Sequence, residues 1–168
     1  MTWLPFDLHP EYPPEGIPRT QLVRRYSDAF HRRLRSVFEA NGLVYNPHPE
    51  VVPNSLGALR LTELARDSGL HEELHDRLMD AYWEDAEDMG DRDVLRLHAA
   101  AVGLPADDVE RVLGGDDYRE RVRASTAEAQ AIGVTGVPAF LLDSRLLVLG
   151  AQPPDVFEQA FEQLEGAA

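Results

Sequence analysis

The chain has 168 residues, 43% of them hydrophobic, which is enough for one folded domain or for a small domain with a sizeable insertion. Its formal net charge of −14 disfavours binding to nucleic acids and to anionic membrane surfaces, because both depend on clustered Lys and Arg. The chain contains no cysteine, so disulfides, thiolate nucleophiles and cysteine-ligated metals are excluded.

The first residues carry neither the basic segment nor the apolar run of a signal peptide. No apolar stretch approaches membrane-spanning length. We therefore expect a soluble, cytoplasmic protein without a membrane partner.

The N-terminal part is predicted to begin with a short strand, Thr2–Leu8, in which apolar side chains mostly alternate and Pro5 indicates an edge position. A proline-rich loop follows over His9–Pro18. Arg19–Ala40 has apolar residues at helical spacing, and Asn41-Gly42 predicts the end of that long helix.

The middle of the chain is predicted to be helical throughout, because apolar residues recur at helical spacing between Gly and Pro stop signals. The expected helices run from a cap at Asn54 or Ser55 to about Ser68, and then over His71–Met89 and Arg92–Val102, from Asp107 or Asp108 to Gly114-Gly115, and over Asp116–Ile132.

The pattern changes after Gly133. Ala139–Leu142 and Leu146–Leu149 are short apolar runs separated by a polar tripeptide, which predicts a β-hairpin. Pro153-Pro154 then begins a last helix that runs to about Leu164. The order of strand, helical block, hairpin and helix favours an α/β or α+β fold over a helical bundle.

Three motifs resemble those of DsbA-like thioredoxin-fold proteins. Gly133–Phe140 reads GVTGVPAF and resembles the family signature GVxGVPxF. Gly150–Pro154 resembles the family's GAQP turn into the final helix, and Trp3–Gly16 is similar to its second strand and the loop after it. Asn54-Ser55 with Arg60-Leu61 resembles the FrnE-like and 2-hydroxychromene-2-carboxylate-isomerase-like subgroup.

The resemblance implies an α/β fold with a thioredoxin-like sheet and a large all-helical insertion. The sheet would be built from residues 1–18 and 116–168, and the insertion from residues 19–115. It further implies a cis Val137-Pro138 bond beside a bound thiol. Val137, Pro138 and Asn54 are therefore the candidate substrate-binding residues, and no residue is assigned a catalytic role.

Members of this family begin with a βα unit that carries CxxC, or a Ser or Cys equivalent, at a helix N-terminus. We expect that N-terminal strand and active-site helix to be missing from these 168 residues. An upstream segment lost through a misassigned start, a second chain that fills the gap, or direct closure of the remaining strands would each account for this. The first explanation is favoured.

The activity implied by resemblance is thiol–disulfide exchange, yet a chain without cysteine is expected to be redox-inactive as given. One alternative is a relative of glutathione-dependent isomerases or transferases, with glutathione as its thiol cofactor. Another is a non-catalytic binding module of the same fold. The expected partners are a small thiol or a protein thiol, and a homodimer is a further option.

A match to a zinc motif and a cluster of arginines are both interpreted as structural features and not as binding sites. His71–His75 reads HEELH, which matches a zinc-protease motif with Glu72 as base, and Glu84 or Asp85 could be proposed as a third ligand. We predict that the two histidines flank a buried stripe and bind no zinc. The arginines of the first long helix are interpreted as a solvated face in preference to a phosphate site; they are Arg24, Arg25, Arg32, Arg33 and Arg35.

Overall fold

The computed structural model describes the chain except residues 26–27 and 167–168. Five helices form a helical block: α3 (Leu56–Asp67), α4 (His71–Trp83), α5 (Arg92–Ala101), α6 (Ala106–Gly114) and α7 (Arg119–Ala131). Each of the first four places apolar side chains on one face, and these faces meet in the main core around Leu61, Leu74, Leu95 and Val112, all at most 1% exposed. Burial of each such side chain contributes roughly 1.5–3 kcal/mol.

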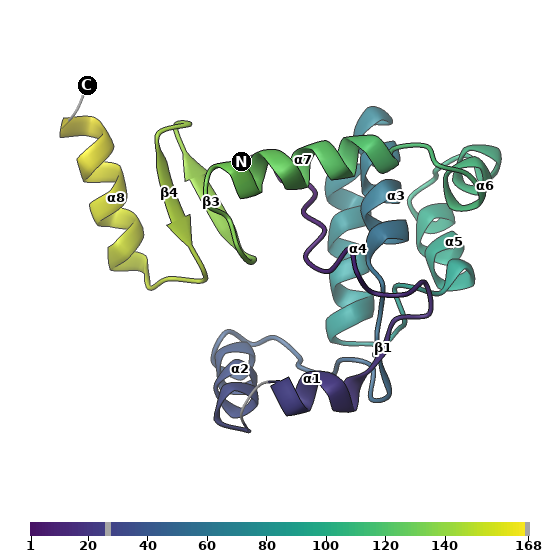
Figure 1. Cartoon of the computed structure of the whole chain (residues 1–168), viewed down its shortest axis with the longest axis horizontal. Helices are drawn as coiled ribbons and strands as arrows, with labels where there is room; N and C mark the ends of the chain where they lie inside the picture. The colour runs from purple at the N-terminus through teal and green to yellow at the C-terminus, as the bar shows by residue number, and fades with distance from the viewer. Residues whose placement is uncertain (26–27, 167–168) are drawn as a thin grey trace.

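The predicted strand Thr2–Leu8 is wrong, because residues 1–7 have no regular secondary structure. Hydroxyl groups of α7 occupy backbone groups that a neighbouring strand would pair. The Pro5 carbonyl accepts a hydrogen bond from Ser125 Oγ (2.7 Å), and the Asp7 N–H donates to Thr126 Oγ1 (2.9 Å). The segment is therefore held along a helix as an irregular chain (Figure 1).

The predicted helix Arg19–Ala40 is described as two helices, α1 (Arg19–Arg25) and α2 (Asp28–Ala40). Residues 26–27, which the prediction placed inside one helix, lie outside the described residues. Two two-residue strands that were not predicted flank these helices in the chain, β1 (Ile17–Pro18) before α1 and β2 (Val51–Val52) after α2. The two strands pair antiparallel.

The predicted helix His71–Met89 is too long, since α4 ends at Trp83. The loop residue Asn46 explains the early end. Its N–H donates to the Trp83 carbonyl (2.6 Å) and its Nδ2 donates to the Glu84 carbonyl (2.9 Å). A distant segment thus takes carbonyl groups that another helical turn would have used.

The predicted hairpin is confirmed, with β3 (Ala139–Leu142) and β4 (Leu146–Leu149) paired antiparallel in the register Ala139↔Leu149. Asp143, Ser144 and Arg145 form the three-residue loop, and the Arg145 N–H donates to the Leu142 carbonyl at 3.0 Å. Asp143 and Ser144, the two central residues of that turn, both have positive φ (50° and 54°). The last helix, α8 (Pro154–Gly166), packs on this sheet through Phe157, whose ring lies edge-on to Phe140 at 5.0 Å.

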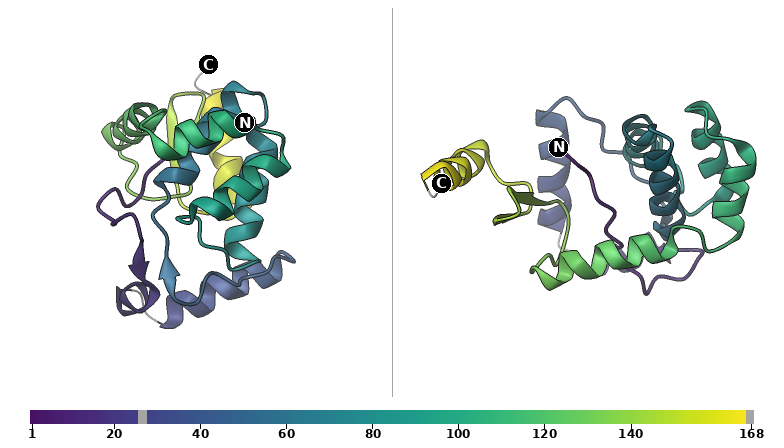
Figure 2. Two further views of the ribbon diagram at one scale, coloured as in Figure 1. Left: turned by 90° about the vertical axis from the view of Figure 1, so that its right-hand side faces the viewer. Right: turned by 90° about the horizontal axis from the view of Figure 1, so that it is seen from above.

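The hairpin and α8 lie to one side of the molecule and helices α3 to α6 lie to the other, with α7 running between them (Figures 1 and 2). No helix in the described part of the chain is both long enough and apolar enough to cross a membrane.

Candidate functional site: the segment before the hairpin

The segment that leads from α7 into the hairpin is fixed at its start by a helix-ending motif. The Gly133 N–H donates to the Gln130 carbonyl and the Val134 N–H donates to the Ala129 carbonyl, both at 3.0 Å. This arrangement needs a left-handed residue, and Gly133 supplies it with φ +98°. Val134 is buried, so the segment leaves α7 in one direction.

The same segment is fixed at its end by the Gly150–Pro154 motif. The Val137-Pro138 peptide bond is cis, which confirms the prediction. The Pro138 carbonyl accepts a hydrogen bond from the Gly150 N–H at 2.8 Å, so the GVP and GAQ motifs meet at the open end of the hairpin. Gln152 Nε2 donates to the Leu149 carbonyl at 2.7 Å and closes the turn into α8.

Val137 itself is presented to solvent, with 56% of its surface exposed. Neither its N–H nor its carbonyl has a hydrogen-bond partner among the described residues. In the described part of the chain β3 pairs with β4 alone, so the other edge of β3 is open. An open edge with unpaired backbone groups can accept an extended ligand as an additional strand.

Asn54 is not brought to this segment. Its Oδ1 accepts from the Leu56 N–H (2.9 Å), which confirms the capping interpretation, and its Nδ2 donates to the Tyr12 carbonyl (2.7 Å). The side chain therefore joins the start of α3 to the proline-rich loop, within the helical block. A ligand role for Asn54 stays a prediction, as do the ligand roles of Val137 and Pro138.

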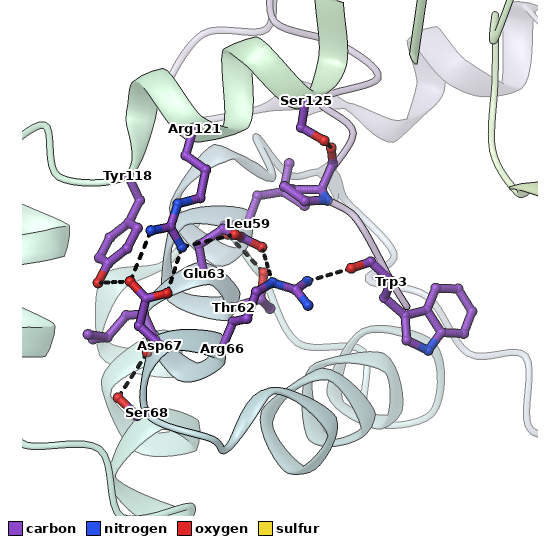
Figure 3. A network of polar contacts seen from close by, with 12 residues as sticks. Trp3, Leu59, Thr62, Glu63, Arg66, Asp67, Ser68, Tyr118, Arg121 and Ser125 are labelled. Carbon is purple, nitrogen blue, oxygen red and sulfur yellow. Dashed lines mark hydrogen bonds and ion pairs between the residues drawn. The ribbon is translucent and has the colours of Figure 1, made fainter. Parts of the chain in front are cut away.

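A polar network that the sequence did not reveal anchors α7, and with it the segment, to α3 (Figure 3). Arg121 donates both terminal nitrogens to Asp67 (2.8 and 3.0 Å), and Tyr118 donates its hydroxyl to the same carboxylate (3.0 Å). The hydrogen bond from Arg121 is the main reason that the pKa of Asp67 is lowered. Burial first, and then the bond to Asp67, raise the pKa of Tyr118.

The centre of this network is Glu63, which is 2% exposed. Its carboxylate lies 3.0 Å from Arg66 Nε and 3.4 Å from Arg121 Nη1. Arg66 also donates to the Trp3 carbonyl, so the N-terminal segment is tied to the same group. No spacing along the sequence indicates the pairing of α3 with α7, since the partners are 54 and 58 residues apart.

His71 and His75 stack on each other at 5.7 Å, and His75 stacks on Trp3. Burial lowers the pKa of both imidazoles. Among the described residues no group of three or more His, Asp or Glu side chains is placed to hold a metal ion. The absence of zinc stays a prediction, which elemental analysis of protein purified without a tag would check.

The family model for the DSBA-like thioredoxin domain matches residues 1–162. The Bacillus subtilis protein YwbO is 26% identical over 161 residues, which cover 94% of this chain and 78% of YwbO.

Two solved structures are similar. The probable DsbA oxidoreductase SCO1869 from Streptomyces coelicolor has a TM-score of 0.86 and 32% identity, over 97% of this chain and 74% of that one. A structure from Nitrosomonas europaea has a TM-score of 0.65 over 91% of this chain and 79% of its own. Its 17% identity makes this a likeness of fold alone.

Proposed function

Because the chain belongs to the DSBA-like thioredoxin domain family and contains no cysteine, we propose that it binds a thiol or disulfide ligand for DsbA-type chemistry. In this proposal the 168 residues supply the binding surface and no sulfur nucleophile. Thiol–disulfide exchange passes through a mixed disulfide, which a chain without cysteine cannot form.

The observation that carries the proposal is the pair of unpartnered backbone groups on exposed Val137, next to the open edge of β3. An extended ligand that pairs with Val137 would exchange hydrogen bonds to water for backbone bonds, each with a net contribution of about 1 kcal/mol. Its side chains would then lie over the hairpin, where Leu141 and Leu149 are half exposed.

Two finer assignments belong to the proposal. The division into a thioredoxin-like part (residues 1–18 and 116–168) and an insertion (residues 19–115) is supported by the main core, since its buried members all come from Ala58–Leu113. Membership in the FrnE-like or isomerase-like subgroup is proposed from the motif that contains Arg60, whose side chain donates to the carbonyls of Val112, Gly115 and Asp117.

The test is a binding titration followed by ¹H–¹⁵N spectra of the whole chain. The probes are a blocked, extended peptide with a central cysteine, the same peptide with serine at that position, and glutathione. We expect the Val137 and Ala139 amide signals to shift with the cysteine peptide. Val137→Pro removes the N–H donor and should weaken binding about tenfold, while the control Val137→Ala keeps the donor and should bind within about threefold of the unaltered chain.

Three outcomes separate the alternatives. Binding of glutathione in preference to the peptide would favour the isomerase or transferase relative. Equal binding of the cysteine and serine peptides would favour a non-catalytic module that recognises extended backbone. Shifts confined to residues far from Val137, or equal losses for the two Val137 variants, would contradict the proposed site.

A further inference from the structure

A cavity with a volume of about 380 Å³ lies apart from the hairpin. Three separate segments line it. Arg19 comes from the start of α1, and His31, Arg32 and Arg35 come from α2; Tyr45, Asn46 and Pro47 complete the lining from the loop. Arg35 shares one side of α2 with His31 and Arg32, because positions three and four apart are neighbours on a helix.

Within the described part of the chain, none of Arg19, Arg32 and Arg35 forms an ion pair. Seven other arginines do pair with carboxylates, namely Arg66, Arg96, Arg111, Arg119, Arg121, Arg123 and Arg145. In a chain with 30 acidic and 16 basic residues, three arginines without a carboxylate around one cavity indicate a site for an external anion.

The wall of the cavity is held rigid by aromatic rings. Tyr45 stacks on Trp83 at 5.7 Å and lies edge-on to Phe38 at 5.3 Å. The Arg35 guanidinium lies over the Tyr45 ring, 5.1 Å from its centroid. Asn46, whose two hydrogen bonds end α4, fixes the loop that carries Tyr45.

Two further observations point into the same space. Burial raises the pKa of the Tyr45 hydroxyl, and the positive charges of Arg19 and Arg35 partly oppose that rise. Both guanidiniums therefore lie close enough to the hydroxyl to affect its charge. His31 Nε2 is buried and has no hydrogen-bond partner among the described residues. Arg19 keeps its orientation because its Nε and Nη2 donate to the His48 and Val51 carbonyls.

We propose that this cavity binds a small dianion of the phosphate-monoester class, which replaces, for Arg32 and Arg35, the interpretation as a solvated face. Guanidinium forks match the oxygens of a phosphate in pairs, and the Tyr45 hydroxyl can donate a hydrogen bond beside them. The volume suits a small molecule. A nucleic acid is excluded as the ligand because the net charge of −14 would repel a long polyanion. This inference does not rest on the binding role proposed for Val137.

The test is isothermal titration of the whole chain with phenyl phosphate, with inorganic phosphate, and with acetate as a singly charged comparison. We expect one saturable site for the two phosphates and at least tenfold weaker binding of acetate. Arg32→Ala and Arg35→Ala should each weaken phenyl phosphate binding about tenfold or more. The control Arg77→Ala, on the exposed face of α4, removes the same charge and should leave binding unchanged.

A second measurement on the unaltered chain covers the case in which a variant fails to fold. Titration with phenyl phosphate should shift the Nε–Hε signals of Arg19, Arg32 and Arg35 together, with one dissociation constant. Equal weakening by Arg77→Ala, absence of saturable binding, or shifts of other arginine signals without these three would each overturn the proposal.

Discussion

The indole ring of Trp3 stacks on the imidazole of His75, with ring centroids 4.9 Å apart and an angle of 27° between the planes. His75 in turn stacks on His71, one helical turn earlier in α4. The HEELH sequence, which matches a zinc motif, therefore serves as the surface on which the irregular N-terminal segment lies.

This stack predicts a loss of stability in acid. Burial lowers the pKa of His71 and His75 below the ordinary value of 6.5, so the unfolded chain binds more protons than the folded chain as the pH falls. The contribution is fully present above pH 6.5 and is lost as the pH falls through 6.5 and then through the lower folded pKa. Thermal unfolding between pH 7.5 and pH 5 would measure it. His75→Phe keeps an aromatic ring on Trp3 and should reduce the pH dependence, whereas Glu73→Gln, exposed on the same helix, should not.

Gly16 is expected to tolerate no side chain. It has φ +74°, and a Cβ there would lie 2.4 Å from the Val52 carbonyl oxygen, within the β1–β2 pair. Gly16→Ala should lower the free energy of unfolding by about 2–4 kcal/mol, combining backbone strain with displacement of β2. Gly42→Ala is the matched control, because Gly42 has φ +72° and open space around it. Its cost should be only about 1 kcal/mol. Equal costs in urea unfolding would contradict the steric explanation.

Replacement of Arg60 by lysine is expected to destabilise the fold. It is 4% exposed and donates to the carbonyls of Val112, Gly115 and Asp117 at the end of α6. A lysine ammonium cannot present the same planar set of donors, so Arg60→Lys should cost about 2–3 kcal/mol in chemical unfolding. Arg77→Lys on the exposed face of α4 should cost nearly nothing. A stable Arg60→Lys protein would show that the three carbonyls are satisfied in another way.

The network around Glu63 predicts a coupling between α3 and α7. Arg121→Ala leaves the buried Glu63 carboxylate with Arg66 alone and should destabilise the chain by about 2 kcal/mol. Arg123→Ala, which breaks only an exposed 3.6 Å pair with Glu120, should cost less than about 0.5 kcal/mol. A double-mutant cycle with Glu63→Gln would measure the coupling directly. Additive effects of the two substitutions would argue against a shared network.

The absence of cysteine predicts no thiol–disulfide exchange by this chain alone. Reduction of insulin disulfides by dithiothreitol should proceed at the rate of the blank in its presence. A rate above the blank that disappears when the chain is unfolded would contradict the prediction. The same protein sample should still give the Val137 amide shifts with the cysteine peptide, which separates ligand binding from catalysis.

The sequence by itself determined the features that depend on neighbours along the chain. Gly133 and Gly150 are two of the glycines that stand where a left-handed residue is needed, and the polar tripeptide between β3 and β4 specifies a hairpin. The helices of the block were predicted from apolar spacing, because a helix that packs on a core must repeat its apolar residues every three to four positions.

Only the tertiary structure decided which distant residues each segment contacts. Thr2–Leu8 alternates like a strand, but Ser125 and Thr126 bind its backbone and no strand lies beside it in the described residues. The ends of α4, the partners of Glu63 and the grouping of Arg19 with Arg35 likewise depend on residues far away in the sequence. Hydrogen bonds and ion pairs need only closeness in space, and closeness between distant segments leaves no periodic pattern along the chain.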